Sequence, residues 1–237
     1  MQNKRFVSQF FGYITPRQAA AGIEAALTNA RSLYADAQLL LEKERWGRAA
    51  ALSILAIEEV GKVPIIREIL LARNSDDLKV AWHSYRTHTA KSLIHLWPVL
   101  AAKGARHLED FREIYDRSRE EPPMLDAIKQ LGFYSDASGK CNWSLPEEVI
   151  DSDLARTVFS LAKFLVSRGP SAFESEAELE IWVKHLKRVW KGPMSEMKKA
   201  LLACYAEAQG LGVLRGTSSE GGMMNFLFNR ASSARPI

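Results

Sequence analysis

A chain of 237 residues with 47% hydrophobic and 25% charged residues has the composition of an ordinary globular protein, which excludes a disordered or fibrous chain. The 32 basic and 28 acidic residues leave a net charge of only +4, so composition gives little support for a dedicated nucleic-acid-binding protein. The two cysteines are too few for a disulfide framework, and no apolar run reaches the roughly 18–20 residues that cross a bilayer, so we expect a cytoplasmic protein with no membrane partner.

The first predicted element is a long helix over residues 16–41. Thr15 can cap this helix, Pro16 occupies its first position, and Gln18 stands three residues after the cap. Apolar residues then recur at three- and four-residue steps, and charged residues fall between them. This pattern predicts one buried face and one exposed face.

A second helix is predicted over residues 46–70, after a short charged connection. Its apolar residues follow the same period, so the first two helices should form an antiparallel hairpin. Pro64 lies inside this pattern, where it removes a backbone donor and crowds the carbonyl group four residues earlier. We therefore expect a kink or break near residues 60–62.

A third helix is expected after the turn-forming residues 74–77. It should carry Trp82 and Leu96 before Pro98 ends it. A strongly charged stretch, residues 108–117, predicts a fourth helix.

The C-terminal half should contain a small hairpin or ordered loop near residues 131–143, where turn residues separate aromatic ones. Helices are predicted over residues 153–167, 177–190 and 195–209. The last stretch, 210–237, is rich in Gly, Ser and Arg and has no sustained period, so it predicts a flexible tail. The expected all-α architecture has a helical bundle over residues 1–120, the hairpin and C-terminal helices packed on the same body over 121–209, and the tail.

Charged residues end the apolar run of the second helix. Glu59 lies four residues after Leu55 and so falls on the expected core stripe, while Glu58 lies beside it and four residues before Lys62. A buried carboxylate must be paired or protonated, because an unpaired charge in an apolar medium costs several kcal/mol. One interpretation is a structural Glu58–Lys62 ion pair with Glu59 bonded to a neighbouring helix. The other is a functional polar site at a helix kink.

The predicted third helix carries a second group of polar side chains. On a regular helix, His88 and Lys91 share one face with Tyr85, whereas Arg86 accompanies His83 on a different face. One interpretation is the ordinary surface of an amphipathic helix. The alternative is a cationic groove for RNA phosphate or a nucleotide, because Arg and Lys form charge-assisted bonds to phosphate and His titrates near neutral pH.

The spacing of the histidines argues against a metal site. Four of the five histidines lie within residues 83–107. However, His88 and His95 are two turns apart, about 10 Å along a helix axis, and the interval from His83 to His88 does not suit one ion. No metal or other cofactor is therefore expected.

Short motifs along residues 15–150 share their order and spacing with one known family. The first comprises Asn29, Ala30, Leu33, Asp36, Ala37, Leu40 and Leu41. The next two comprise Arg48, Ala49, Leu52, Leu55, Ala56, Glu58, Glu59, Gly61 and Lys62, and then Trp82, Arg86, His88 and Lys91. The last comprises Lys129, Gln130, Leu131, Gly132, Phe133, Tyr134, Trp143 and Pro146. Together they resemble the AbiV family of abortive-infection proteins, whose core belongs to the HEPN class of four-helix domains.

The resemblance implies a bacterial anti-phage protein that halts growth of the infected cell by attacking or blocking RNA and the translation machinery. HEPN domains commonly form dimers with an RNA-cleaving Arg and His at the dimer groove. In the usual motif the His follows the Arg after a few intervening residues. This sequence departs from that pattern, because Arg86 and His88 are separated by a single residue and no other His has an Arg at the usual interval.

We therefore interpret the chain as a protein that inhibits translation by binding RNA, a translation component or a phage-encoded protein. In this interpretation Glu58, Lys62, Lys91, His83 and Tyr85 are binding residues. A homodimer is expected.

The alternative is a conditional, metal-independent endoribonuclease, so the sequence leaves open whether the protein is an enzyme. His88 would then act as acid or base, Arg86 would hold phosphate, and Glu59 would orient or pair with these groups. A third interpretation is a non-catalytic dimeric helical scaffold.

Overall fold

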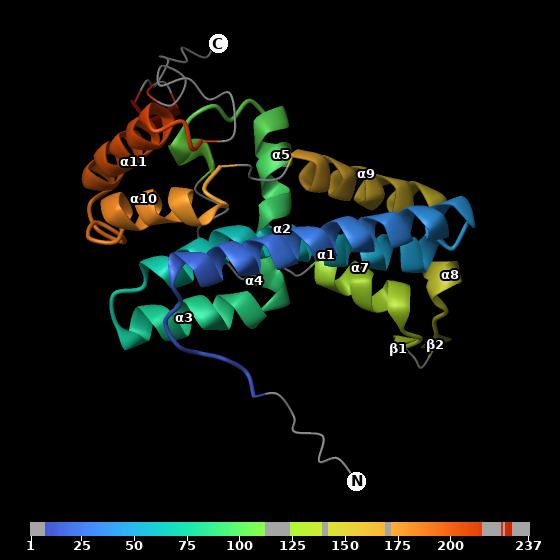
Figure 1. Ribbon diagram of the computed structural model, residues 1–237. Helices are drawn as coiled ribbons and strands as arrows, with labels where there is room; N and C mark the ends of the chain where they lie inside the picture. Colours follow the sequence, from blue (N-terminus) through green and yellow to red (C-terminus); the bar gives the residue numbers. More distant parts are fainter. Residues whose placement is uncertain are drawn as a thin grey trace.

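The computed structural model describes residues 8–111, 124–138, 142–168, 172–214, 224 and 226–228, and in them nearly all regular structure is helical (Figure 1). The predicted all-α class is confirmed. Helix α2 (Trp46–Leu71) crosses the centre of the molecule and contacts α1, α3, α4, α7, α8, α9 and α10. Among the described helices, none is long and apolar enough to cross a membrane.

Helices α1 (Pro16–Glu42) and α2 form the predicted antiparallel hairpin. The Thr15 side chain accepts from the Gln18 backbone N–H, and the Gln18 side chain accepts from the Thr15 N–H, so the expected cap is confirmed. Pro64 lies inside α2, and the helix continues from Trp46 to Leu71, so of the two expected outcomes the break is wrong and the kink stays a prediction. Packing on several sides of α2 holds the helix together past the proline.

The predicted third helix is interrupted, which corrects the expectation of one helix running to Leu96. Helix α3 (Ser75–Arg86) ends at Thr87, whose backbone is extended, and α4 (His88–Ser92) begins in a new direction. The Thr87 hydroxyl donates to the His83 carbonyl at 2.9 Å, an example of a β-branched hydroxyl side chain competing with regular helix bonding. The chain continues through η1 (Leu93–His95) and α5 (Leu96–Ala102).

The predicted fourth helix, residues 108–117, is only partly described. Its first residues form the 3₁₀ turn η2 (Leu108–Phe111), and the remainder lies outside the described residues. The Asp110 carboxylate accepts from the backbone N–H groups of Arg106 and His107, which fixes the start of this turn.

Helix α7 (Met124–Phe133) packs against α2 and leads into the predicted small hairpin, whose strands begin at Ala137 because residues 131–133 still belong to the helix. Strands β1 (Ala137–Ser138) and β2 (Asn142–Trp143) are antiparallel, with Ala137 opposite Trp143. The hairpin is followed by α8 (Pro146–Val149). A Cβ atom on Gly132 would overlap the carbonyl oxygen of Gly47, so only glycine permits this close approach of α7 to α2.

The remaining helices cover two regions of the central hairpin. Helix α9 (Ser152–Arg168) packs on α1 and α2, while α10 (Glu176–Leu186) and α11 (Met194–Gly210) pack on each other. The predicted helix 177–190 therefore ends four residues earlier than expected. In Figure 1, α10 and α11 lie near one end of α2, and α7 and α8 lie near the other.

A short piece of the predicted tail contacts the helical body. Leu227 is 1% exposed, and the Phe226 ring lies 6.1 Å from the Phe111 ring of η2. Most other residues of the stretch 215–237 lie outside the described residues. The predicted division at residue 120 stays a prediction, although α7 and α9, which follow it, pack directly on α2.

Candidate functional site

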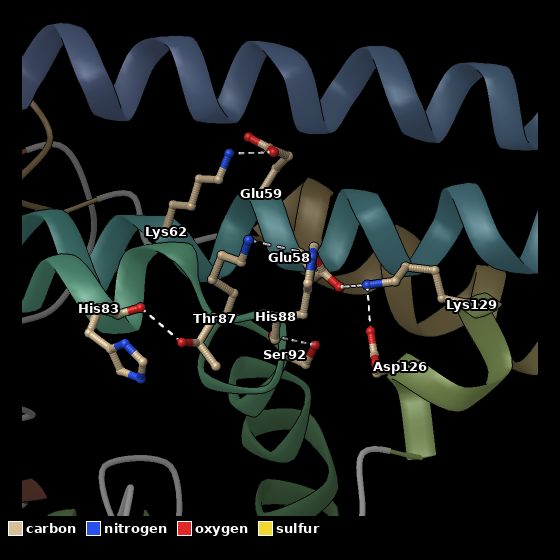
Figure 2. A network of polar contacts seen from close by, with 10 residues as sticks. Glu58, Glu59, Lys62, His83, Thr87, His88, Ser92, Asp126 and Lys129 are labelled. Atoms are coloured by element: carbon tan, nitrogen blue, oxygen red, sulfur yellow. Dashed lines mark hydrogen bonds and ion pairs between the residues drawn. The ribbon is translucent and has the colours of Figure 1, made fainter. Parts of the chain in front are cut away.

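Charged side chains from α2, α4 and α7 meet around the carboxylate of Glu58 (Figure 2). The Nζ of Lys129 donates to Glu58 Oε1 at 2.6 Å, and the Nδ1 of His88 lies 2.6 Å from Oε2. Lys91 Nζ lies 3.7 Å from the same Oε2. On α7, Asp126 Oδ1 lies 2.7 Å from the Nζ of Lys129. We refer to Glu58, His88, Lys91, Asp126 and Lys129 as the Glu58 cluster.

The cluster depends on a close approach of α4 to α2. A Cβ atom on Gly61 would overlap the carbonyl oxygen of Lys91, so this position allows α4 to lie directly on the α2 backbone. The break at Thr87 places His88 at the start of α4, and the Ser92 hydroxyl donates to the His88 carbonyl at 3.0 Å. These two local features bring His88 and Lys91 to Glu58.

Burial makes the charges in this cluster depend on one another. The side chains of Glu58, Lys91 and Lys129 are 3%, 8% and 5% exposed, so each charge needs a partner within the protein. Burial lowers the pKa of Lys91, and the Glu58 carboxylate opposes that effect. With both lysines protonated, two ammonium groups balance the carboxylates of Glu58 and Asp126.

His88 lies at the exposed rim of the cluster. Its side chain is 52% exposed, whereas the carboxylate that it contacts is buried. An ionised carboxylate can only accept, so the short contact places a hydrogen on Nδ1. When the imidazole is neutral, Nε2 then carries the lone pair and acts as an acceptor. The arrangement can serve either hydrogen-bonded recognition or proton transfer.

Glu59 and Lys62 form a separate pair next to the cluster. Lys62 Nζ lies 2.5 Å from Glu59 Oε1, and it lies 5.5 Å from the centre of the Tyr85 ring. Of the two interpretations, the one with a structural Glu58–Lys62 ion pair is therefore wrong: Lys62 pairs with Glu59, and Glu58 contacts α4 and α7. Among the described contacts, Tyr85 lies against Lys62 of this pair, and none joins it to Glu58.

Arg86 is held away from the cluster by the N-terminal segment. Its guanidinium group donates to the carbonyl oxygens of Phe10 at 2.6 Å and Trp82 at 3.1 Å. The same group lies 3.9 Å from the centre of the Phe11 ring. His83 is exposed, and its backbone carbonyl, not its ring, accepts from Thr87. The structure thus brings His88 and Lys91 to Glu58 but not Arg86 or His83.

A model of one protein family matches well over half of the sequence. The AbiV model, which describes an HEPN-type domain, matches residues 18–167. The chain belongs to the AbiV family of abortive-infection proteins. The expected HEPN helical domain is thereby confirmed, and all of the Glu58 cluster lies within the matched residues. No curated protein and no solved structure matches the chain.

The sequence alone did not point to two residues of this site as functional. Lys129 and Asp126 both come from α7, more than sixty residues after Glu58. Lys129 begins the motif of residues 129–134 that supported the family resemblance, and Asp126 precedes it by three residues on the same helical face. A buried carboxylate at Glu58 would have indicated that a cationic side chain lies nearby. The sequence contains many lysines, so it could not indicate which one pairs with Glu58.

Three groups of the Glu58 cluster have metal-ligand chemistry but already surround a cation. Ligand atoms of Glu58, His88 and Asp126 all lie within 4.8 Å of one another. The Nζ of Lys129, however, contacts both carboxylates, at 2.6 and 2.7 Å. A metal ion would have to displace this buried ammonium group, so the residues fit an ion-pair cluster better than a metal centre.

Proposed function

We propose that this AbiV-family protein defends bacteria against phage by arresting growth of the infected cell, and that it does so by binding a component of translation instead of cutting RNA. Family membership supports the defence role. The charge pairing of the Glu58 cluster supports recognition over catalysis. In this proposal the exposed His88 imidazole contributes to the binding surface.

The proposal rests on the partners that the cationic side chains near His88 already have. Metal-independent RNA cleavage needs a base near the 2′-hydroxyl and a cation near the phosphate. In the described part of the cluster, Lys91 and Lys129 are both buried and face carboxylates. Arg86 is engaged with backbone carbonyls elsewhere. These groups would have to give up existing partners before they could hold a phosphate.

A ribonuclease is the second candidate, because one feature of His88 favours it. A buried carboxylate that holds Nδ1 of a half-exposed imidazole is the arrangement that orients a general acid or base. In that case the cationic side chain that binds the phosphate would come from a second copy of the chain in the proposed homodimer.

A cell-free translation reaction separates the candidates. Purified wild-type protein and His88→Ala are added with and without an extract of phage-infected cells, and both protein synthesis and RNA integrity are followed. Lys79→Ala, on the exposed surface of α3, is the control variant. We expect wild type and Lys79→Ala to arrest synthesis with RNA intact, and His88→Ala to lose most of the arrest.

Two results would overturn the proposal. RNA fragments that appear with wild type and disappear with His88→Ala would establish the ribonuclease instead. A folded wild-type protein that neither arrests synthesis nor cuts RNA in either reaction would leave the scaffold interpretation.

A further inference from the structure

We propose that Lys129 is a positioning residue that keeps the His88 imidazole neutral, because it supplies to Glu58 the positive charge that the imidazole would otherwise carry. Lys129 does not touch His88 in this arrangement and acts through the shared carboxylate. The link to arrest rests on the proposed function, whereas the protonation state of His88 does not.

The two oxygens of Glu58 have different partners. Oε1 accepts from Lys129, and Oε2 faces His88 and, at a longer distance, Lys91. Because the Glu58 side chain is 3% exposed, water cannot replace a missing cation, and a buried carboxylate retains its charge only next to positive groups. If the Lys129 ammonium group is removed, the Glu58 carboxylate therefore favours a positive charge on His88, its other close partner.

The charges of the described groups facing His88 balance without a proton on its ring. Glu58 from α2 and Asp126 from α7 are negative, and Lys91 from α4 and Lys129 from α7 are positive. The neighbouring Glu59–Lys62 pair on α2 adds no net charge. Loss of the Lys129 charge leaves one uncompensated negative charge, and protonation of His88 is the nearest way to restore the balance.

Asp126 determines how much positive charge Lys129 delivers. Its carboxylate lies 2.7 Å from Nζ, so the Lys129 ammonium group contacts Asp126 as well as Glu58, and the two residues are three apart on α7 (Figure 2). If Asp126 and Lys129 are both replaced by neutral residues, Glu58 and Lys91 remain and again sum to zero. The charge model therefore predicts that the second replacement reverses the effect of the first.

The neutral imidazole defines the chemistry that His88 can recognise. With hydrogen on Nδ1, Nε2 of the half-exposed ring accepts a hydrogen bond, so it suits a hydroxyl or amino group of the partner. An imidazolium ion would donate from Nε2 and would favour a phosphate or carboxylate instead. Lys129 thus selects a hydrogen-bond donor over an anion as the group that meets His88.

Nitrogen NMR of the imidazole ring measures this state in the full chain. The 15N-labelled wild type, Lys129→Met, Lys129→Arg and the double variant Asp126→Asn/Lys129→Met are compared at pH 7. Lys79→Met, which removes an exposed charge outside the cluster, is the control. We expect His88 to be mostly neutral with hydrogen on Nδ1 in wild type, Lys129→Arg, Lys79→Met and the double variant, and mostly protonated in Lys129→Met.

The outcomes separate this inference from the proposed function. A protonated His88 in wild type, or a neutral His88 in folded Lys129→Met, would overturn the inference even if translation is arrested. If Lys129→Met does not fold, a protonated His88 in Lys129→Gln reversed by Asp126→Asn supports the inference, and a neutral one contradicts it. Absence of arrest with the expected ring states would contradict only the proposed function.

Discussion

Gly61 shows how a single residue without a side chain can determine where charged groups meet. The carbonyl oxygen of Lys91 occupies the space that a Cβ atom at residue 61 would need. The same contact sets the depth at which Lys91 and His88 lie against Glu58. Gly22 on α1 offers a comparison, because a Cβ atom there would meet Ile66 at an ordinary 3.5 Å.

Replacing Gly61 by Ala should therefore push α4 away from α2. We expect a loss of about 1–3 kcal/mol in the free energy of unfolding, as for other overpacked positions. Gly22→Ala should instead be neutral or stabilising by up to about 1 kcal/mol, because Ala is the better helix former. Urea unfolding of both variants measures the difference. Equal stabilities for the two variants would contradict the close packing of α4.

At the residue scale, the sequence predicted a buried carboxylate but not the groups that pair with it. The sequence indicated that at least one of Glu58 and Glu59 points into the bundle, and Glu58 does. The single-stripe argument favoured Glu59 because it assumed that α2 buries one face. In the structure α2 has neighbours on several sides, so adjacent residues can both face protein.

At the scale of elements, helix ends with clear side-chain caps were predictable and the interruption at Thr87 was not. The Thr15 and Asn74 side chains cap α1 and α3. Such caps are predictable because they depend only on residue types within a few positions of the helix start. Residues 75–96 show continuous helical periodicity, and a threonine at residue 87 does not by itself predict a break. The packing of α4 against Gly61 joins segments thirty residues apart, so it cannot be recognised from the local sequence.

A surface connection between elements has a predictable pH dependence. Asp77 in the first turn of α3 lies 3.0 Å from the Nζ of Lys191, in the turn before α11. The hydrogen bond from Lys191 lowers the pKa of Asp77 below its ordinary value of 3.8. A lowered carboxyl pKa stabilises the folded state above the ordinary value, and this contribution is lost as the pH falls through the folded-state pKa.

We therefore expect Asp77→Asn to lower the thermal midpoint at pH 7 and to differ little from wild type in strong acid. Asp76→Asn is the matched control, since Asp76 occupies the same helical turn but is 89% exposed and lies 3.7 Å from Lys79. Thermal unfolding of all three proteins between pH 7 and strong acid supplies the comparison. A pH-independent effect of Asp77→Asn would argue against the ion pair.

At the scale of the whole molecule, α2 is the helix on which the separately predicted segments α4 and α7 meet. The long helical hairpin and the all-α class follow from periodicity and capping, which are local properties. The meeting of α4 and α7 on α2 is a long-range property, because Glu58 and Lys129 are 71 residues apart in sequence. The family resemblance indicated that both segments matter, but only the fold brings their charges together.

The central claim is that Glu58 and Lys129 act as one buried unit linking α2 to α7. A double-mutant cycle of Glu58→Met, Lys129→Met and the double variant, followed by urea unfolding, tests it directly. Each single variant leaves one unbalanced charge among the remaining buried groups and should lose up to about 3–5 kcal/mol. The double variant keeps Asp126 and Lys91 in balance and should lose much less than the sum. Losses that simply add, with no coupling between the two positions, would contradict the account.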